Sequence, residues 1–417
     1  MGELFYRLGI SLLSIGVKIH SLFNTKSKKF VEGRRNLFEQ LENRFSQVNQ
    51  NVVWFHCASL GEFEQGRPII EAFKKRYPDY FILLTFFSPS GYEVRKSYKG
   101  ADYVSYMPLD TASNAKQFVE ITQPKIAFFV KYEFWHYHLN ALSNSDCWVY
   151  SISAIFRANQ RFFKFYGGFH RKILHHFDHI FVQNKKVESL LKGINLHNVT
   201  ISGDTRFDRV YSISQNVKSI KLFDDFARNE KVLIGGSTWE EDIKVMAPFL
   251  KEYPDWKAII APHDISEKNL KLHEQLIGGS SERFTKIDGV IKTETKVIII
   301  DNIGLLSSLY QYGTIAFIGG AYGDGLHNTL EAACFRMPIF FGDQNYKKFQ
   351  EAVDLIRLKA AYPLKDSQEF ISIFNSADFD LEKASNSALQ YVDENIGATQ
   401  IILNHIAPII DKLEIAS

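Results

Sequence analysis

The chain has 417 residues, 45% of them hydrophobic and 23% charged, which suits a folded protein with more than one hydrophobic core. Its net charge of +2 argues against a protein that binds nucleic acid through its overall charge. The three cysteines, Cys57, Cys147 and Cys334, are far apart and form no Cys-x-x-Cys pair. This pattern argues against a disulfide framework or a cysteine zinc site and fits a reducing compartment.

The first 35 residues combine an apolar helical face with basic residues. The residues predicted to share that face are Leu4, Leu8, Leu12, Ile15 and Ile19. The net charge of residues 1–35 is +5. The uncharged run 8–17 is only half as long as a membrane span requires. We therefore expect 1–35 to be an amphipathic segment that lies on, or is shallowly anchored in, an anionic membrane surface. A helix packed on the protein's own surface is the alternative.

Short apolar runs alternate with helical patterns along the rest of the chain, which is typical of parallel sheets covered by helices. The first series of predicted strands is 52–56, 81–85, 103–106, 126–130, 148–152 and 179–182, with helices such as 62–76 and 111–121 between them. A second series follows at 232–235, 258–261, 297–300, 315–319 and 339–341.

This repetition predicts an α/β protein with two facing Rossmann-like domains, whose ligands bind at the carboxyl ends of strands beside a cleft. The predicted divisions are the membrane-associating segment 1–35, an N-terminal Rossmann-like domain 36–208, a connection 209–230, a C-terminal Rossmann-like domain 231–394 and a C-terminal helix 395–417. One possible arrangement has that last helix packed on the N-terminal domain.

Two glutamates follow predicted strands of the first domain. In the segment 54–68, a Ser-Leu-Gly turn with Ser59 and Gly61 leads to Glu62, which opens a helix. A carboxylate there is placed to act as a general base, and Gly61 leaves room for a substrate. Glu133, in the segment 128–137, is predicted to begin a helix in the same way. In both cases a carboxylate that only favours the first helical turn is the alternative.

Strand ends in the second domain carry groups suited to a nucleotide. Ser237 and Thr238 lie between a strand and a helix, where they are expected to cap the helix or contribute to an anion site. His263 follows the next strand and is predicted either to contact a phosphate or base or to be structural.

A glycine-rich segment at 317–342 gives the strongest sequence signal. Gly323 and Gly325 belong to its loop, and His327 and Asn328 are predicted to open a helix with Glu331 one turn inside. Glycines let the chain wrap around phosphates, and a helix start supplies N–H donors. The spacing matches neither the dinucleotide nor the P-loop pattern. The histidines at 136, 138, 175, 176 and 179 lack an HExxH motif, so no metal site is predicted.

Together these segments resemble the 3-deoxy-D-manno-octulosonic-acid (Kdo) transferases of lipopolysaccharide synthesis. The resemblance rests on HCASLGE, YEFW, SGDTRFD, GGSTWEED, APHD, DNIGLL and GGAYGDGLHNTLEAA, in this order along the chain. It implies an inverting glycosyltransferase of the B type with CMP-Kdo as donor, a lipid A precursor as acceptor, a membrane-associated N-terminus and no metal cofactor.

The resemblance also assigns roles to individual residues. By matching position, Glu62 is the catalytic base and Glu133 an acid on the acceptor side. The positions that match the nucleotide-binding pattern are Ser237, Thr238, His263, Gly304, Asn328 and Glu331. Arg206 replaces a lysine that is usual near the cleft, which keeps the charge and changes its geometry.

Three departures from the family pattern concern the acceptor side more than the donor side. His136 replaces a proline, 153–155 reads Ser-Ala-Ile where Asn-Ala-Arg is usual, and 331–333 reads Glu-Ala-Ala where Glu-Pro-Ala is usual. The expected reaction is Kdo transfer from CMP-Kdo to lipid IVA at the cytoplasmic face of the bacterial inner membrane. The alternatives are a related nucleotide-sugar enzyme, such as a lipid A disaccharide synthase or an epimerase, and a catalytically silent membrane-bound adaptor.

Overall fold

The computed structural model describes residues 2–416, which form two compact units. Unit 1 contains the chain up to Arg209 and again from Ile396 onward, whereas unit 2 contains Val210–Asn395. The terminal segments predicted at 1–35 and 395–417 each include one residue, Met1 or Ser417, that lies outside the described part.

Unit 1 is built on a seven-stranded parallel sheet with the order β3-β2-β1-β4-β5-β6-β7. Its strands are β1 (Val52–Cys57), β2 (Phe81–Phe86), β3 (Tyr103–Tyr106), β4 (Pro124–Val130), β5 (Trp148–Ala154), β6 (His179–Val182) and β7 (Val199–Ile201). The strand order reverses between β1 and β4, and in open α/β sheets ligands bind at the carboxyl end of such a reversal.

Helices cover both faces of this sheet, because successive side chains of a buried strand point to opposite faces. Trp54 packs in one cluster with residues of α3, α6 and α7, and Phe55 packs in the other with residues of α4 and α19. The helices of unit 1 are α1 (Gly2–His20), α2 (Thr25–Glu32), α3 (Leu37–Phe45), α4 (Leu60–Arg76), α5 (Pro89–Arg95), α6 (Ala112–Thr122), α7 (His136–Ser143), α8 (Gly168–Leu174), α9 (Lys185–Lys192), the start of α10 (Thr205–Gln215) and α19 (Ala398–Ala416).

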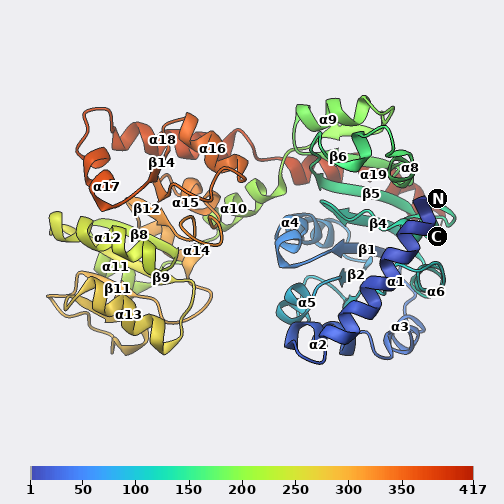
Figure 1. Cartoon of the computed structure of the whole chain (residues 1–417), viewed down its shortest axis with the longest axis horizontal. Helices are drawn as coiled ribbons and strands as arrows, with labels where there is room; N and C mark the ends of the chain where they lie inside the picture. Colours follow the sequence, from blue (N-terminus) through green and yellow to red (C-terminus); the bar gives the residue numbers. More distant parts are fainter. Residues whose placement is uncertain (1, 417) are drawn as a thin grey trace. The chain divides into compact units, whose positions relative to one another are not determined.

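The C-terminal helix α19 belongs to unit 1, although the whole of unit 2 precedes it in the chain. Its buried residues Ile402, Leu403, Ile406 and Ile410 join the cluster of α4 and β1. At its start, the Asp208 carboxylate accepts hydrogen bonds from two backbone N–H groups, those of Gly397 at 2.5 Å and Thr399 at 2.6 Å. Figure 1 shows this red helix among the blue and green elements of unit 1.

Unit 2 repeats the same plan with a second parallel sheet, in the order β10-β11-β9-β8-β12-β13-β14. Its strands are β8 (Lys231–Thr238), β9 (Trp256–Pro262), β10 (Ser281–Arg283), β11 (Val297–Ile299), β12 (Ile315–Ile318), β13 (Ile339–Gly342) and β14 (Ala361–Leu364). Its helices are α11 (Lys221–Ala227), α12 (Glu240–Glu252), α13 (Glu267–Ile277), α14 (Leu306–Leu309), α15 (Leu330–Cys334), α16 (Gln350–Arg357), α17 (Ser367–Phe374) and α18 (Leu381–Asp393).

All eleven strands predicted from the sequence are present, and β7, β10 and β14 are additional short strands. The segment 209–230 contains the rest of α10 and the helix α11, whose Phe223 and Phe226 are buried. It is therefore more ordered than its polar composition indicated. The prediction of two parallel-sheet α/β domains is confirmed for the described residues.

The N-terminal helix α1 contacts the rest of unit 1 through the side that carries Tyr6 and Ile10. Ile10 is its one buried residue, whereas Leu4, Leu8, Leu12, Ile15 and Ile19 are all exposed. Within residues 2–416, no helix has both the length and the apolar character needed to span a bilayer. The amphipathic helix predicted for this segment is thus present, with its apolar face unpaired by the protein.

Candidate active site

Glu62 lies at the carboxyl end of β1, where the strand order of unit 1 reverses. Ser59 is the N-cap of α4; its side chain accepts a hydrogen bond from the Gly61 N–H and donates one to a Glu62 carboxylate oxygen. Glu62 is half-buried and Gly61 is exposed. A Cβ at Gly61 would meet only Ser59 Oγ, at 3.8 Å, so packing does not require glycine there. The open backbone leaves space beside the carboxylate.

Glu133 is buried in the loop after β4 rather than at a helix start. The expectation that it begins a helix was wrong, because α7 starts three residues later at His136. One oxygen of its carboxylate accepts a hydrogen bond from Trp135 Nε1 at 2.5 Å and lies 3.1 Å from His56 Nε2. Side chains rather than a helical turn therefore fix this carboxylate.

A chain of hydrogen bonds sets the tautomer of His56. Thr85 Oγ1 accepts from Trp54 Nε1 at 2.7 Å and lies 2.8 Å from His56 Nδ1. The threonine hydroxyl can then donate to Nδ1, which leaves the proton of the neutral imidazole on Nε2, facing Glu133. Burial lowers the pKa of His56, although Glu133 acts in the opposite direction. His56 is thus held neutral as a hydrogen-bond donor to Glu133.

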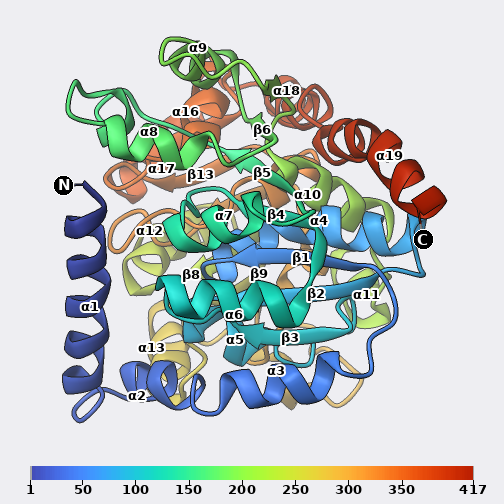
Figure 2. The same ribbon diagram turned by 90° about the vertical axis from the view of Figure 1, so that its right-hand side faces the viewer.

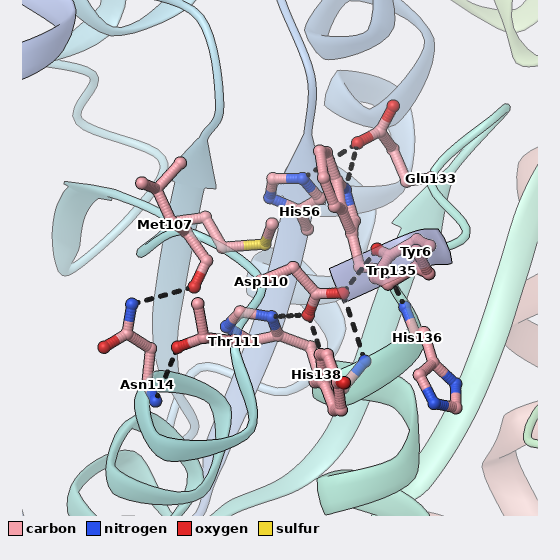
Figure 3. A network of polar contacts seen from close by, with 12 residues as sticks. Tyr6, His56, Met107, Asp110, Thr111, Asn114, Glu133, Trp135, His136 and His138 are labelled. Atoms are coloured by element: carbon pink, nitrogen blue, oxygen red, sulfur yellow. Dashed lines mark hydrogen bonds and ion pairs between the residues drawn. The ribbon is translucent and has the colours of Figure 1, made fainter. Parts of the chain in front are cut away.

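A second buried carboxylate, Asp110, joins α1 to the first turn of α7. Its two oxygens accept hydrogen bonds from Tyr6 Oη and from the backbone N–H groups of Tyr137 (3.1 Å) and His138 (2.9 Å), and His138 Nδ1 is also in contact. Figure 3 shows these groups converging on the carboxylate, with Tyr6 arriving from α1. Burial raises the pKa of Asp110, but the hydrogen bonds hold it below its usual range.

Sequence reasoning missed Asp110, Tyr6 and His56 as parts of this region. Asp110 follows β3 just as Glu62 follows β1, so a polar residue after a strand was the available signal. Tyr6 and Ile10 are four residues apart and lie off the exposed apolar face of α1, which marks them as the side that packs on the protein.

Arg206, expected near the cleft, is held within unit 1 in the first turn of α10. Its guanidinium is 2.8 Å from the buried Asp204 carboxylate, which also accepts from Gln65 Nε2 at 3.1 Å. Burial raises the pKa of Asp204, yet the Arg206 charge and hydrogen bonds hold it below its usual value. Part of the arginine's charge is therefore balanced by its own neighbour.

In unit 2, Ser237 and Thr238 are the last two residues of β8 and not the cap of the next helix. Trp239 takes the N-cap position of α12, and its backbone N–H is bound by the Asp242 carboxylate at 2.8 Å. The capping role expected for Ser237 or Thr238 was wrong. Ser237 has a φ of 53°, and the buried Thr238 Oγ1 has no hydrogen-bond partner among the described residues.

Asp242 connects the start of α12 to the glycine-rich segment. The same oxygen that binds the Trp239 N–H accepts from the Gly320 N–H at 3.1 Å, while the other oxygen is buried without a described partner. Burial raises the pKa of Asp242 to about 6. Beside it is a cavity of about 230 Å³ lined by Trp239, Glu240, Glu241, Asp242, Gly320, Tyr322, Gly323 and Asp324.

The glycine-rich segment forms a tight turn between β12 and α15. Gly320 and Gly325 have positive φ angles of 94° and 134°, whereas Gly323 has none. The Asn328 amide accepts from the Leu330 N–H and donates to Glu331, both at 3.1 Å. The predicted helix start at His327–Asn328 was wrong, because α15 begins at Leu330 and Glu331 is its second residue. Lys348, which no sequence pattern singled out, lies 3.5 Å from the Asp324 carbonyl oxygen in this turn.

Three ring side chains stack beside this turn. The His263 ring packs against Trp239 at 4.5 Å and against His327 at 4.7 Å between ring centres. Burial lowers the pKa of His327, and the neighbouring His263 adds to the effect. Gly304, with a φ of 102°, lies after β11, the strand that pairs with β9. The structure thus brings His263 and His327 together and places Gly304 at the same edge of the sheet.

Comparison with known proteins relates the chain to a family of glycosyltransferases. Residues 35–209 match the family described as 3-deoxy-D-manno-octulosonic-acid transferase (kdotransferase). The chain is 27% identical to the enzyme of that name from Aquifex aeolicus, over 80% of this chain and 89% of the relative. It is 24% identical to the one from Rickettsia bellii, over 99% of both chains. The chain is a glycosyltransferase related to the Kdo transferases.

Solved structures agree with this relationship at the level of the fold. A UDP-GlcNAc 2-epimerase from Neisseria meningitidis, bound to UDP-GlcNAc, superposes with a TM-score of 0.60 at 14% identity, over 85% of this chain and 99% of that chain. A glycosyltransferase from Rickettsia africae gives 0.55 at 12% identity, over 87% and 99%. This Kdo transferase relative therefore has the two-domain architecture of B-type glycosyltransferases.

Metal-ligating side chains do not gather in the described part of this glycosyltransferase. Between residues 2 and 416, no group of three or more His, Cys, Asp or Glu side chains is arranged to hold a metal ion. The ring centres of His136 and His176 are 6.5 Å apart, but no third metal-binding side chain among the described residues joins them.

Proposed function

We propose that the chain transfers Kdo from CMP-Kdo to a lipid A precursor such as lipid IVA, with inversion at the anomeric carbon. The observation that carries the proposal is similarity to a Kdo transferase over 99% of both chains, which includes the Glu62 turn and the glycine-rich turn. The reaction is expected to need no cofactor.

Glu62 is the proposed general base. It accepts the proton of an acceptor hydroxyl, whose oxygen attacks the anomeric carbon of Kdo, and the bond from that carbon to the CMP phosphate breaks. Its position at the end of β1 and the open backbone at Gly61 support this role. The Ser59 hydroxyl, which donates to Glu62, orients the carboxylate.

Unit 2 is the proposed donor-binding unit. The Lys348 ammonium beside the glycine-rich turn is suited to stabilise the negative charge that develops on the departing CMP. The stacked rings of Trp239, His263 and His327 offer hydrogen-bonding groups and flat faces beside that turn. Ser237, Thr238, Gly304, Asn328 and Glu331 complete the proposed donor set.

On the acceptor side, we assign Glu133 and Arg206 to substrate recognition in addition to Glu62. Glu133 is oriented by His56 and Trp135, and Arg206 by Asp204. The proposed location is the cytoplasmic face of the bacterial inner membrane, with α1 lying on the bilayer through its exposed apolar face. A lipid acceptor is embedded in that surface, so association brings enzyme and acceptor together.

The test is release of CMP from CMP-Kdo with and without a tetraacylated lipid A precursor, followed by mass spectrometry of the lipid. We expect acceptor-dependent release and a lipid heavier by one or more Kdo residues. CMP binding without release would indicate a silent adaptor, and turnover of a uridine nucleotide sugar would indicate a different transferase or an epimerase.

Replacement of Glu62 by Gln tests the base. We expect Glu62→Gln to lower kcat about 10²–10⁴-fold without loss of CMP binding. Glu71→Gln is a matched control, because Glu71 lies on the same helix and pairs with Arg67 on its surface at 2.7 Å. Near-normal turnover of Glu62→Gln would refute the assignment.

A further inference from the structure

The segment 161–169 carries five aromatic residues, and the structure sorts them by exposure. Phe162 is buried against Phe134 and Phe156, and Phe163 and Phe169 are half-buried. In contrast, Phe165 is 94% exposed and Tyr166 is 62% exposed, with their ring centres 5.2 Å apart. Two adjacent aromatic side chains are therefore presented to the surroundings by a segment that buries its other aromatics.

The backbone that presents the pair is fixed by specific contacts. The Arg171 guanidinium donates to the carbonyl oxygens of Phe162 at 3.0 Å and Lys164 at 2.8 Å, on either side of Phe163. Gly167 follows the pair, and a Cβ there would lie 2.0 Å from the Arg161 carbonyl oxygen, so the turn requires glycine. The exposure of Phe165 and Tyr166 thus results from an ordered turn.

The pair precedes helix α8, which packs beside the N-terminal end of α1. Phe169, at the start of α8, packs its ring 5.9 Å from that of Tyr6, and a Cβ at Gly2 would lie 2.6 Å from Phe169 Cβ. Figure 2 shows the segment that leads into α8 beside the N-terminal end of α1. Among the described residues of unit 1, large apolar side chains more than 60% exposed occur in 2–23, in this pair and at Ile415.

The charges around the pair favour an anionic surface. Residues 147–177 contain five Lys or Arg residues and no Asp or Glu. These residues are Arg157, Arg161, Lys164, Arg171 and Lys172. Aromatic side chains favour the interfacial zone of a bilayer, and nearby cations are attracted by anionic headgroups.

We propose that Phe165 and Tyr166 insert into the headgroup region of an anionic bilayer and form a second membrane contact of unit 1, separate from α1. The inference rests on the proposed membrane association of α1 and adds to it. One amphipathic helix leaves unit 1 free to pivot on the membrane. A second contact from a different part of the unit restrains that motion and so fixes how the site of Glu62 is presented to a lipid.

Vesicle binding of the full chain tests the proposal. We expect Phe165→Ser/Tyr166→Ser to weaken partition into vesicles of 30% phosphatidylglycerol in phosphatidylcholine at least tenfold. The control is Val290→Ser/Ile303→Ser, which removes two similarly exposed apolar side chains from unit 2 and is expected to leave partition unchanged. In a Phe165→Trp variant, tryptophan emission is expected to shift to shorter wavelength on these vesicles and to be quenched by brominated lipid.

The outcomes separate this proposal from the proposed function. If the wild-type chain does not bind the vesicles, membrane association itself fails. If Leu12→Ser/Ile15→Ser abolishes binding but the Phe165/Tyr166 double variant binds like the wild type, only the second contact is refuted. If the Phe165/Tyr166 double variant binds vesicles normally but loses turnover on an acceptor dispersed in detergent, the pair contacts the acceptor rather than the bilayer. That result would overturn the proposal.

Discussion

Asp110 in unit 1 and Asp242 in unit 2 are both buried aspartates that follow strands, yet their surroundings act on them in opposite directions. Both oxygens of Asp110 accept hydrogen bonds, and its pKa lies below the usual range. Asp242 binds two N–H groups with one oxygen, its other oxygen has no described partner, and burial raises its pKa to about 6. Both oxygens of Asp110 are thus satisfied within unit 1, whereas one oxygen of Asp242 has no described partner beside the glycine-rich turn.

The surroundings of Asp242 contain further polar atoms of the same kind. Buried polar atoms are almost always paired in folded proteins, so a group of unpaired ones needs a partner such as water, an ion or a ligand. Besides Asp242 Oδ1, Thr238 Oγ1 and Thr329 Oγ1 are buried without described partners near the same turn. The Asp110 network is better explained as a support that holds α1 and the start of α7 in place.

The largest expected effect is loss of that support. We expect Asp110→Ala to lower the free energy of unfolding of unit 1 by about 3–5 kcal/mol, because four donors lose their acceptor in a buried site. Urea unfolding is the measurement, with exposed Asp146→Ala as a control that changes stability by less than about 0.5 kcal/mol. If the two variants unfold alike, the network is not a structural support.

A smaller effect concerns the pH dependence that Asp242 confers. Its pKa is about 6 in the fold and 3.8 for an unperturbed aspartate side chain, so the folded state retains a proton that the unfolded state loses between these values. Stability from this group is therefore present below about pH 4 and is lost as pH rises through 6, by up to about 3 kcal/mol.

Replacement of Asp242 by Asn removes that titration and keeps an acceptor for the two N–H groups. We expect Asp242→Asn to gain stability relative to the wild type as pH rises from 4 to 7, measured by urea unfolding at each pH. If the free energies of unfolding of the wild type and of Asp242→Asn change with pH in the same way, the Asp242 carboxylate is not held in an unfavourable site.

The smallest expected effect tests the turn itself. Gly320 has a φ of 94°, and a Cβ there would lie 2.5 Å from the Gly325 carbonyl oxygen. We expect Gly320→Ala to weaken CMP binding about tenfold, since strain of this kind costs about 1–3 kcal/mol. The affinity for CMP is measured by titration calorimetry. The control is Gly279→Ala, because a Cβ at Gly279 meets nothing within 4 Å. If Gly320→Ala binds CMP as tightly as the wild type, the turn does not shape the donor site.

The sequence predicted the fold well because buried parallel strands are continuous apolar runs, and every such run became a strand. It predicted helix starts poorly, since Glu133 and His327 lie in loops whose lengths depend on tertiary contacts. One partner of Glu133, His56, comes from the distant strand β1, and the partners of Asp110 come from α1 and α7. Such long-range pairing has no local pattern, whereas the Ser59–Glu62 pair is local and lies in the first turn of α4, which begins at Leu60, two residues before the predicted start.

The return of α19 to unit 1 has a consequence for synthesis of the protein. Because ribosomes add about 5–20 residues per second, the 186 residues of Val210–Asn395 take roughly ten to forty seconds to appear. During that interval the apolar surface on α4 and β1 lacks Ile402, Ile406 and Ile410, while unit 2 emerges as one uninterrupted stretch. We expect unit 2 to fold first, and the nascent first unit to need protection by a chaperone until the last helix emerges.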